Sequence, residues 1–218
     1  GFGSYLPEKI LTNQELPETL NTSHDWILDR TGIAQRHIAA EGELTSDLAL
    51  KAAYAALTHA NVAASSVDMI LVATSTPDRT FPSCAVEVQR KLGITNGFAF
   101  DLQAVCSGFL YGLITADQYI RTGFAKRVLV IGAEIFSRIL DWNDRTTCIL
   151  FGDGAGAVLL QAEQSLDRKS ESGMIASKLY SDGHYSNLLY TDGGPALSNF
   201  VGKVHMQGRE VFKHAVEK

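Results

Sequence analysis

The segment around Cys106 has the residue types of a nucleophilic site. Residues 100–108 (FDLQAVCSG) predict a strand that runs into a tight turn, with a helix beginning directly after Cys106. A thiol at a helix N-terminus faces unpaired backbone N–H groups and the positive end of the helix dipole, which both favour the thiolate. Gly108 would let a substrate or another segment approach closely. The same local pattern also fits a small buried cysteine without chemistry.

The other cysteines and the histidines add no second catalytic group. Cys84 and Cys148 are expected to pack in the core, because one follows a helix cap and the other lies in an apolar run. Three widely spaced cysteines predict neither a disulfide framework nor a zinc site, and we expect no metal. None of the six histidines has a flanking pattern that marks it as the base of a cysteine nucleophile.

Two further groups of residues could bind a nucleotide. Trp26 and Arg30 lie four residues apart on one predicted helix, and Arg145 lies in a polar turn. An indole with guanidinium groups beside it could hold a purine by stacking and cation–π contact, although such residues often only pack on a surface. Residues 152–157 (GDGAGA) superficially resemble a dinucleotide-binding loop, but a strand-like run follows them instead of a helix. We therefore interpret these glycines as a tight turn where backbones pack closely.

The elements that must position these residues alternate along the chain. Strands are expected at 1–5, 68–74, 98–102, 127–133, 158–161, 174–180 and 201–206. Helices are expected at 12–20, 23–30, 45–60 (capped by Thr45 or Ser46), 83–92, 107–122 and from 208 onward. Apolar strands separated by helices predict an α/β fold whose mainly parallel sheet is covered on both faces. The polar segment 163–172 is the best candidate for a boundary.

The composition excludes several classes of protein. The chain has 218 residues, 45% of them hydrophobic, which is typical of a globular protein that can bury a large core. A net charge of −5 argues against a nucleic acid or an anionic membrane as the partner, because phosphate binding draws on a basic face. The sequence has neither a signal peptide nor a run of 18 apolar residues, and a reducing cytoplasm suits its unpaired cysteines.

Taken together, the motifs resemble a known family. The chain is similar, almost from end to end, to β-ketoacyl-acyl-carrier-protein synthase III, the initiating condensing enzyme of bacterial fatty acid synthesis in the thiolase superfamily. The resemblance rests on the order and spacing of the matching stretches. These stretches are 3–7 (GSYLP), 25–27 (DWI), 30–33 (RTGI), 36–39 (RHIA), 80–83 (TFPS), 101–108 (DLQAVCSG), 144–145 (DR), 151–156 (FGDGAG), 181–183 (SDG) and 206–212 (MQGREVF).

The resemblance implies a thiolase-like fold, layered α-β-α-β-α in the full enzyme, and a homodimer. It implies that residues 1–162 are the N-terminal half with the nucleophile and that 163–218 connect to and begin the C-terminal half. On this basis we expect the first half to be complete apart from the start of its first strand, and the second half to be truncated.

The resemblance also implies a reaction. Cys106 matches the nucleophile that takes an acyl group from acyl-coenzyme A (CoA), acetyl by default, and condenses it with malonyl-acyl carrier protein. The products are 3-oxoacyl-acyl carrier protein, CoA and CO₂, and no cofactor is expected besides the CoA thioester substrate. Trp26 and Arg145 match the pair that sandwiches the CoA adenine, and further matching positions are Thr22, Arg30 and Phe212 (CoA contacts), Phe81 (the partner's acyl pocket) and Lys213 (carrier-protein docking).

The sequence departs from the family pattern in one respect. The family's catalytic His and Asn lie in a Pro-His-Gln-Ala-like and a Gly-Asn-Thr-like motif, and neither motif occurs in these 218 residues. The chain therefore resembles the first two thirds of such an enzyme. Two other hypotheses stay open: a catalytically incomplete binding or dimerisation fragment, and a paralogue that makes a secondary metabolite by a similar condensation.

Overall fold

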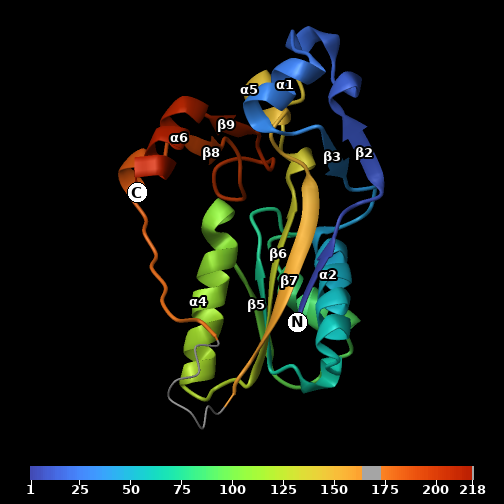
Figure 1. Cartoon of the computed structure of the whole chain (residues 1–218), viewed down its shortest axis with the longest axis vertical. Helices are drawn as coiled ribbons and strands as arrows, with labels where there is room; N and C mark the ends of the chain where they lie inside the picture. The colour runs from blue at the N-terminus through green and yellow to red at the C-terminus, as the bar shows by residue number, and fades with distance from the viewer. Residues whose placement is uncertain (164–172, 218) are drawn as a thin grey trace. The chain divides into compact units, whose positions relative to one another are not determined.

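The computed structural model describes residues 1–163 and 173–217, and the chain divides into two units that are described in turn (Figure 1). Unit 1 comprises Gly1–Leu6, Glu41–Glu134 and Gly154–Leu179, and unit 2 comprises Pro7–Ala40, Ile135–Asp153 and Tyr180–Lys218. Each unit is built from several segments of the chain, so this division does not test the boundary expected between residues 162 and 163, which stays a prediction. Within the described residues, no helix is both long enough and apolar enough to cross a membrane.

Unit 1 is built on one mixed sheet. Its strands pair in the order β1 (Phe2–Tyr5), β7 (Asp153–Gln161), β6 (Arg127–Ile135), β4 (Met69–Ala73) and β5 (Phe98–Leu102). β4 runs parallel to both β5 and β6, whereas β1 runs antiparallel to β7. The parallel pairing expected for most of the sheet is observed for β4, β5 and β6, and β1 adds an antiparallel edge. Every residue of β4 is buried, as its unbroken apolar sequence predicts for a strand covered on both faces.

Helices cover both faces of this sheet. α2 (Thr45–Ala60) and α4 (Gly108–Arg121) lie on opposite sides of it in Figure 1, and α3 (Cys84–Lys91) packs on β4 and β5. Gly112 in α4 lets that helix approach closely, because a Cβ there would lie 3.0 Å from the side chains of Leu71 and Val130. Small residues at this face of α4 therefore set how closely the helix after Cys106 lies on the sheet.

The start of α2 differs from the expected cap. The N-cap residue is Leu44, whose N–H donates to the Asp47 carboxylate at 2.9 Å, so Thr45 and Ser46 lie inside the helix and are buried. The Asp47 carboxylate, at the third helical position, thus satisfies the N–H of the N-cap residue itself.

Three other expectations about elements are wrong. Segment 12–20 forms two short 3₁₀ turns, Asn13–Glu15 and Glu18–Leu20, interrupted at Pro17. Segment 152–157 is no tight turn, because its residues from Asp153 onward belong to β7, along which buried residues alternate. Segment 174–180 has no regular secondary structure, and of 201–206 only Val204–Met206 forms a strand. Most of the expected boundary at 163–172 lies outside the described residues.

Unit 2 is made of short elements. Two antiparallel pairs, β2 (Lys9–Thr12) with β3 (Gln35–Ile38) and β8 (Leu189–Thr191) with β9 (Val204–Met206), accompany the helices α1 (His24–Thr31), α5 (Arg145–Cys148) and α6 (Gly208–Glu217). β2 and β3 were not expected from the sequence, because each has only four residues, of which two in β2 and three in β3 are polar. The expected helix from residue 208 onward is confirmed as α6.

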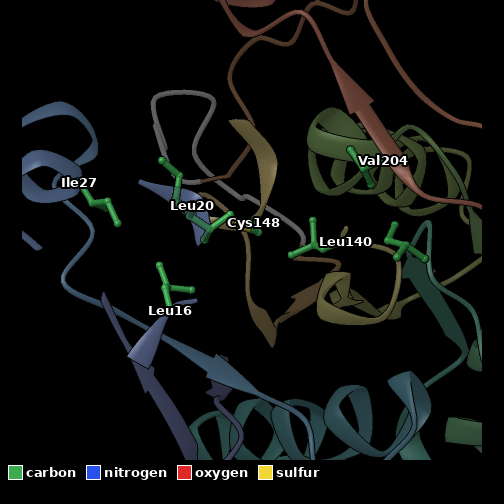
Figure 2. Packing of buried hydrophobic residues seen from close by; sticks show 8 residues of the cluster. Leu16, Leu20, Ile27, Leu140, Cys148 and Val204 are labelled. Atoms are coloured by element: carbon green, nitrogen blue, oxygen red, sulfur yellow. The ribbon is translucent and has the colours of Figure 1, made fainter. Parts of the chain in front are cut away.

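A hydrophobic cluster holds unit 2 together. It contains Leu16, directly after the first 3₁₀ turn, and Leu20 of the second, together with Ile27 of α1, Cys148 of α5 and Val204 of β9, as Figure 2 shows. Trp26 and Trp142 pack against this cluster from its edge. The short helices α1 and α5 therefore share one core, on which their polar side chains are presented.

Candidate functional site

Cys106 lies exposed at the junction between β5 and α4 in unit 1. It is the middle residue of a 3₁₀ turn, Val105–Ser107, and the α-helix itself begins at Gly108, two residues after the cysteine. The expected strand–turn–helix arrangement is therefore confirmed, with a single 3₁₀ turn inserted. A Cβ at Gly108 would lie 3.2 Å from Ala73, so this glycine lets the helix start approach β4.

The backbone before the nucleophile adopts an unusual conformation. Val105 has φ +46°, a left-handed conformation that β-branched residues rarely adopt. In the described part of the chain, no atom accepts a hydrogen bond from the Cys106 N–H, whereas the next two amides donate to Ala104 and Val105. An unpaired N–H beside an exposed thiol can donate to an oxygen that acquires negative charge during attack on a thioester.

The two other cysteines are buried, as expected. Cys84 and Cys148 have no exposed surface, and burial raises the pKa of both thiols. The Cys84 N–H donates to the Asp101 carboxylate at 2.8 Å, as does the neighbouring Ala85 N–H. Asp101, on β5, therefore caps α3 and fixes it against the strand that leads to Cys106. Burial raises the pKa of Asp101, and these two N–H groups oppose the rise.

Unit 1 supplies no histidine to Cys106. His59 is the only histidine in its sequence, and the Nδ1 of His59 accepts a hydrogen bond from the Phe2 N–H at 3.1 Å. Among the described residues, no group of three or more His, Cys, Asp or Glu side chains is placed to hold a metal ion. The features of unit 1 that bear on nucleophilic chemistry are thus the exposed thiol, its free amide and the helix that follows.

Unit 2 brings together the three residues predicted to bind a purine. The Arg30 and Arg145 guanidinium carbons lie 4.3 and 4.9 Å from a ring centroid of Trp26. We call these three side chains the clamp. Two cations beside one indole attract a ligand that combines an aromatic base with phosphate groups.

Local capping holds the clamp residues in place. The Ser23 hydroxyl accepts from the Trp26 N–H at 3.1 Å and caps α1, and Gly32, with φ +71°, ends the helix. Asp144 caps α5 in the same way by accepting from the Thr146 N–H at 2.9 Å. Burial raises the pKa of Asp144, but the hydrogen bonds that it accepts from the threonines of α5 prevail, and the net shift is downward.

The clamp is narrower than the expected sandwich. A purine between two planar groups needs about 7 Å, because stacked atoms stay about 3.5 Å apart on each side. Arg145 instead lies directly over Trp26, and its Nη1 donates to the Asn21 carbonyl at 2.8 Å. The adjacent Thr22 has a buried hydroxyl that makes no hydrogen bond with any described residue. A base stacked between Trp26 and Arg145 would therefore require Arg145 to move aside.

The remaining predicted site residues do not contact the clamp within the described residues. Phe212 and Lys213 lie on α6, exposed, and no ring contact or ion pair within the described residues joins them to Trp26. Phe81 is 81% exposed in unit 1. Sequence reasoning missed two features, the backbone conformation at Val105 and the burial of Arg36, and no local sequence signal marks either of them.

Comparisons with known proteins agree with one another. A family model described as 3-oxoacyl-[acyl-carrier-protein (ACP)] synthase III matches residues 100–183. The chain is 58% identical over 216 residues to the β-ketoacyl-[acyl-carrier-protein] synthase III of Rhizobium rhizogenes strain K84 and 61% identical over 217 residues to that of Bradyrhizobium diazoefficiens. Each alignment covers 99% of this chain and 67% of the relative.

A solved structure shows the same fold. The 3-oxoacyl-(acyl carrier protein) synthase III of Pseudomonas aeruginosa PAO1 superposes with a TM-score of 0.89 at 45% sequence identity, covering all of this chain and 65% of that one. The expected thiolase-like α/β fold is thereby confirmed. The chain spans about two thirds of the length of the relatives that it matches.

Proposed function

The chain belongs to the β-ketoacyl-[acyl-carrier-protein] synthase III family, and we propose that its protein transfers an acyl group from acyl-CoA to Cys106 and condenses it with malonyl-acyl carrier protein. The products are 3-oxoacyl-acyl carrier protein, CoA and CO₂. The observation that carries the proposal is the exposed Cys106 thiol with a free backbone N–H beside it, at the start of α4.

The first step is transthioesterification. The Cys106 thiolate attacks the thioester carbonyl carbon, and the Cys106 N–H donates to the oxygen that becomes negative. The bond from carbon to the CoA sulfur then breaks, and CoA leaves as a thiol once it has taken up the proton lost by the cysteine. One thioester replaces another, so the step needs neither an oxidant nor a metal.

The second step forms the carbon–carbon bond. The bond between the malonyl carboxylate and C2 breaks, CO₂ leaves, and the electron pair on C2 attacks the acyl carbonyl on Cys106. The bond from that carbon to the Cys106 sulfur breaks and regenerates the thiolate. The Cys106 N–H serves the same oxygen as in the first step, because the attacked carbonyl occupies the same place.

The clamp is proposed to hold the adenine end of CoA. Trp26 offers a stacking face, and Arg30 and Arg145 offer charge for the phosphates, with Thr22 and Phe212 as further contacts. The hydroxyl of Thr22, buried and without a partner among the described residues, supports a ligand contact at this point.

The remaining roles follow from the family. We propose a homodimer in which Phe81 lines the partner's acyl pocket, a docking contact of Lys213 with the carrier protein, and work in the cytoplasm without a further cofactor. The exposure of Phe81 is compatible with such a contact.

Acetylation of the chain tests the nucleophile. Incubation with acetyl-CoA should add one acetyl group, located on Cys106 by peptide mass spectrometry. The Cys106→Ala variant should stay unmodified, while Cys84→Ala, which removes a buried thiol, should be acetylated like the wild type. Acetylation of Cys106→Ala at the wild-type rate would refute the assignment. Condensation with malonyl-acyl carrier protein is measured separately, and the range of acyl-CoA primers accepted separates acetyl priming from other acyl chains.

A further inference from the structure

Arg36 is a buried arginine without a carboxylate partner. Its side chain is on β3, and the residue is only 4% exposed. Nη2 donates to the Asn13 side-chain oxygen at 2.8 Å and to the Ile149 carbonyl at 3.0 Å, and Nη1 lies 3.5 Å from the Leu11 carbonyl. Within the described residues, Nε has no hydrogen-bond partner and no acidic side chain forms an ion pair with Arg36.

Asn13 extends this contact to both ends of α1. It is also 4% exposed, and its Nδ2 donates to the Ile33 carbonyl at 2.7 Å and lies 3.4 Å from Nδ1 of His24. His24 is the first residue of α1, and Ile33 directly follows the glycine that ends it. Asn13 thus has one contact at each end of the helix that carries Trp26.

Arg36 connects the same pair to the other clamp helix. Ile149, whose carbonyl it binds, is the residue that ends α5, the helix that begins with Arg145. α5 has four residues and α1 has eight, so neither helix is long enough to hold its place by its own hydrogen bonds. Their positions depend on contacts at their ends.

From these contacts we infer that Arg36, together with Asn13, is the positioning residue of the clamp: the buried pair fixes α1 against α5 and thereby sets how Arg145 lies over Trp26. The inference rests on the proposed function of the clamp in binding CoA. Arg36 contacts neither Arg145 nor Trp26 by any hydrogen bond of the described residues, so its effect on a ligand passes through the two helices.

The chemistry of the guanidinium suits this role. Its planar fork can donate to acceptors from different segments at fixed angles, which a lysine ammonium or an apolar side chain cannot do. A buried cation without a counter-charge is unfavourable for fold stability, and an apolar residue of similar volume would be favoured if stability were all that mattered here. The geometry of its hydrogen bonds, and not fold stability, therefore explains an arginine at this position.

The decisive experiment compares CoA binding by calorimetry for variants of the 218-residue chain. Arg36→Met keeps the volume and removes every donor, and we expect CoA to bind roughly tenfold more weakly. Asn13→Ala keeps the arginine and should weaken binding several-fold, and it replaces the first variant if that one does not fold. The control is Ser137→Ala, which removes another buried side-chain hydrogen bond of unit 2, the one to Asp153, and should bind CoA like the wild type.

A double-mutant cycle distinguishes positioning from general loosening. If Arg36 acts by placing Arg145, Arg36→Met should add little to the loss caused by Arg145→Ala. Equal losses in both backgrounds would overturn the proposal. The proposal would also be overturned if Arg36→Met and Asn13→Ala bound CoA like the wild type while Arg145→Ala bound CoA more weakly. That result would leave the proposed function intact. Wild-type binding by both Trp26→Ala and Arg145→Ala would instead refute the clamp, and the positioning role with it.

A measurement without ligand gives an independent answer. In a Trp142→Phe background, Trp26 is the only tryptophan, and its fluorescence reports the guanidinium groups beside it. Arg36→Met should shift that emission toward the spectrum of Arg145→Ala, while the rate at which iodoacetamide alkylates Cys106 stays unchanged. An unchanged Trp26 spectrum would count against the proposal.

Discussion

Replacing Val105 by glycine should leave the stability of the fold nearly unchanged. The left-handed φ of +46° costs an L residue about 1–2 kcal/mol, with a β-branched side chain at the upper end. Glycine relieves this strain. Against it stand the loss of a side chain that is only about half buried, about 1 kcal/mol, and the larger backbone entropy of glycine in the unfolded chain, about 0.5–1 kcal/mol. The contributions cancel to within about 1 kcal/mol.

A second valine provides the reference for this calculation. Val86, in the first turn of α3, is 38% exposed against 45% for Val105, but has no left-handed backbone to relieve. Val86→Gly should therefore destabilise the fold by about 1–2 kcal/mol. Urea unfolding followed by circular dichroism gives both values. An equal loss of unfolding free energy for the two variants would show that Val105 is not strained.

Val105→Gly should also slow the chemistry at the neighbouring Cys106 thiol. Glycine adopts positive and negative φ about equally well, so the turn that leaves the Cys106 N–H unpaired would be held less firmly. We expect acetylation of Cys106 by acetyl-CoA to slow several-fold at unchanged stability. An unchanged rate would mean that the conformation at Val105 does not prepare the nucleophile.

Three other predictions concern the supports of the site. Iodoacetamide should label Cys106 alone in the folded chain, because the other two thiols are buried; labelling of all three at similar rates, read by peptide mapping, would contradict this. Gly112→Val should destabilise the fold by about 1–3 kcal/mol, since its side chain would overlap β4 and β6, whereas Gly156→Ala, with nothing within 4 Å of the added Cβ, should stay close to the wild type in a urea titration. The lowered pKa of Asp144 means that its stabilising contribution is present above its unfolded pKa and is lost as pH falls through the lower folded value. Asp144→Asn should therefore show a flatter loss of stability than the wild type in thermal melts between neutral and acidic pH, and parallel curves would contradict the assignment.

The sequence predicted those elements in which one local signal dominates. β5 was expected at its observed bounds, and α2 was expected over its full length because alanine and leucine recur at helical spacing. The alternation along β7 was hidden in the sequence, because Gly152 precedes the strand and Gly154 and Gly156 lie on one face of it, a spacing that suggests a turn. Segment 174–180 has a strand-like composition, but in the structure no strand pairs with it.

The clamp residues could be found from their types and spacing, whereas their supports could not. Val105 has a strong preference for extended backbone, so its left-handed conformation arises from tertiary constraints that no local pattern records. Arg36 belongs to a polar strand, and a sequence cannot show that the carbonyl of Ile149, more than a hundred residues away, will accept from its guanidinium. Long-range contacts of this kind decide the geometry of the site.

If the clamp binds CoA as proposed, the position of Arg145 over Trp26 would make it discriminate between ligands by their charge. Opening it breaks the hydrogen bond to the Asn21 carbonyl, about 1 kcal/mol, and the stack on the indole, about 0.5–1 kcal/mol. Together these lower by about 10–30-fold the apparent affinity of a ligand that gives the displaced guanidinium no new partner. A ligand with phosphates offers the displaced guanidinium a new partner and recovers much of that loss. Adenosine alone offers none, so the closed arginine acts as a threshold that favours charged nucleotides over the bare nucleoside.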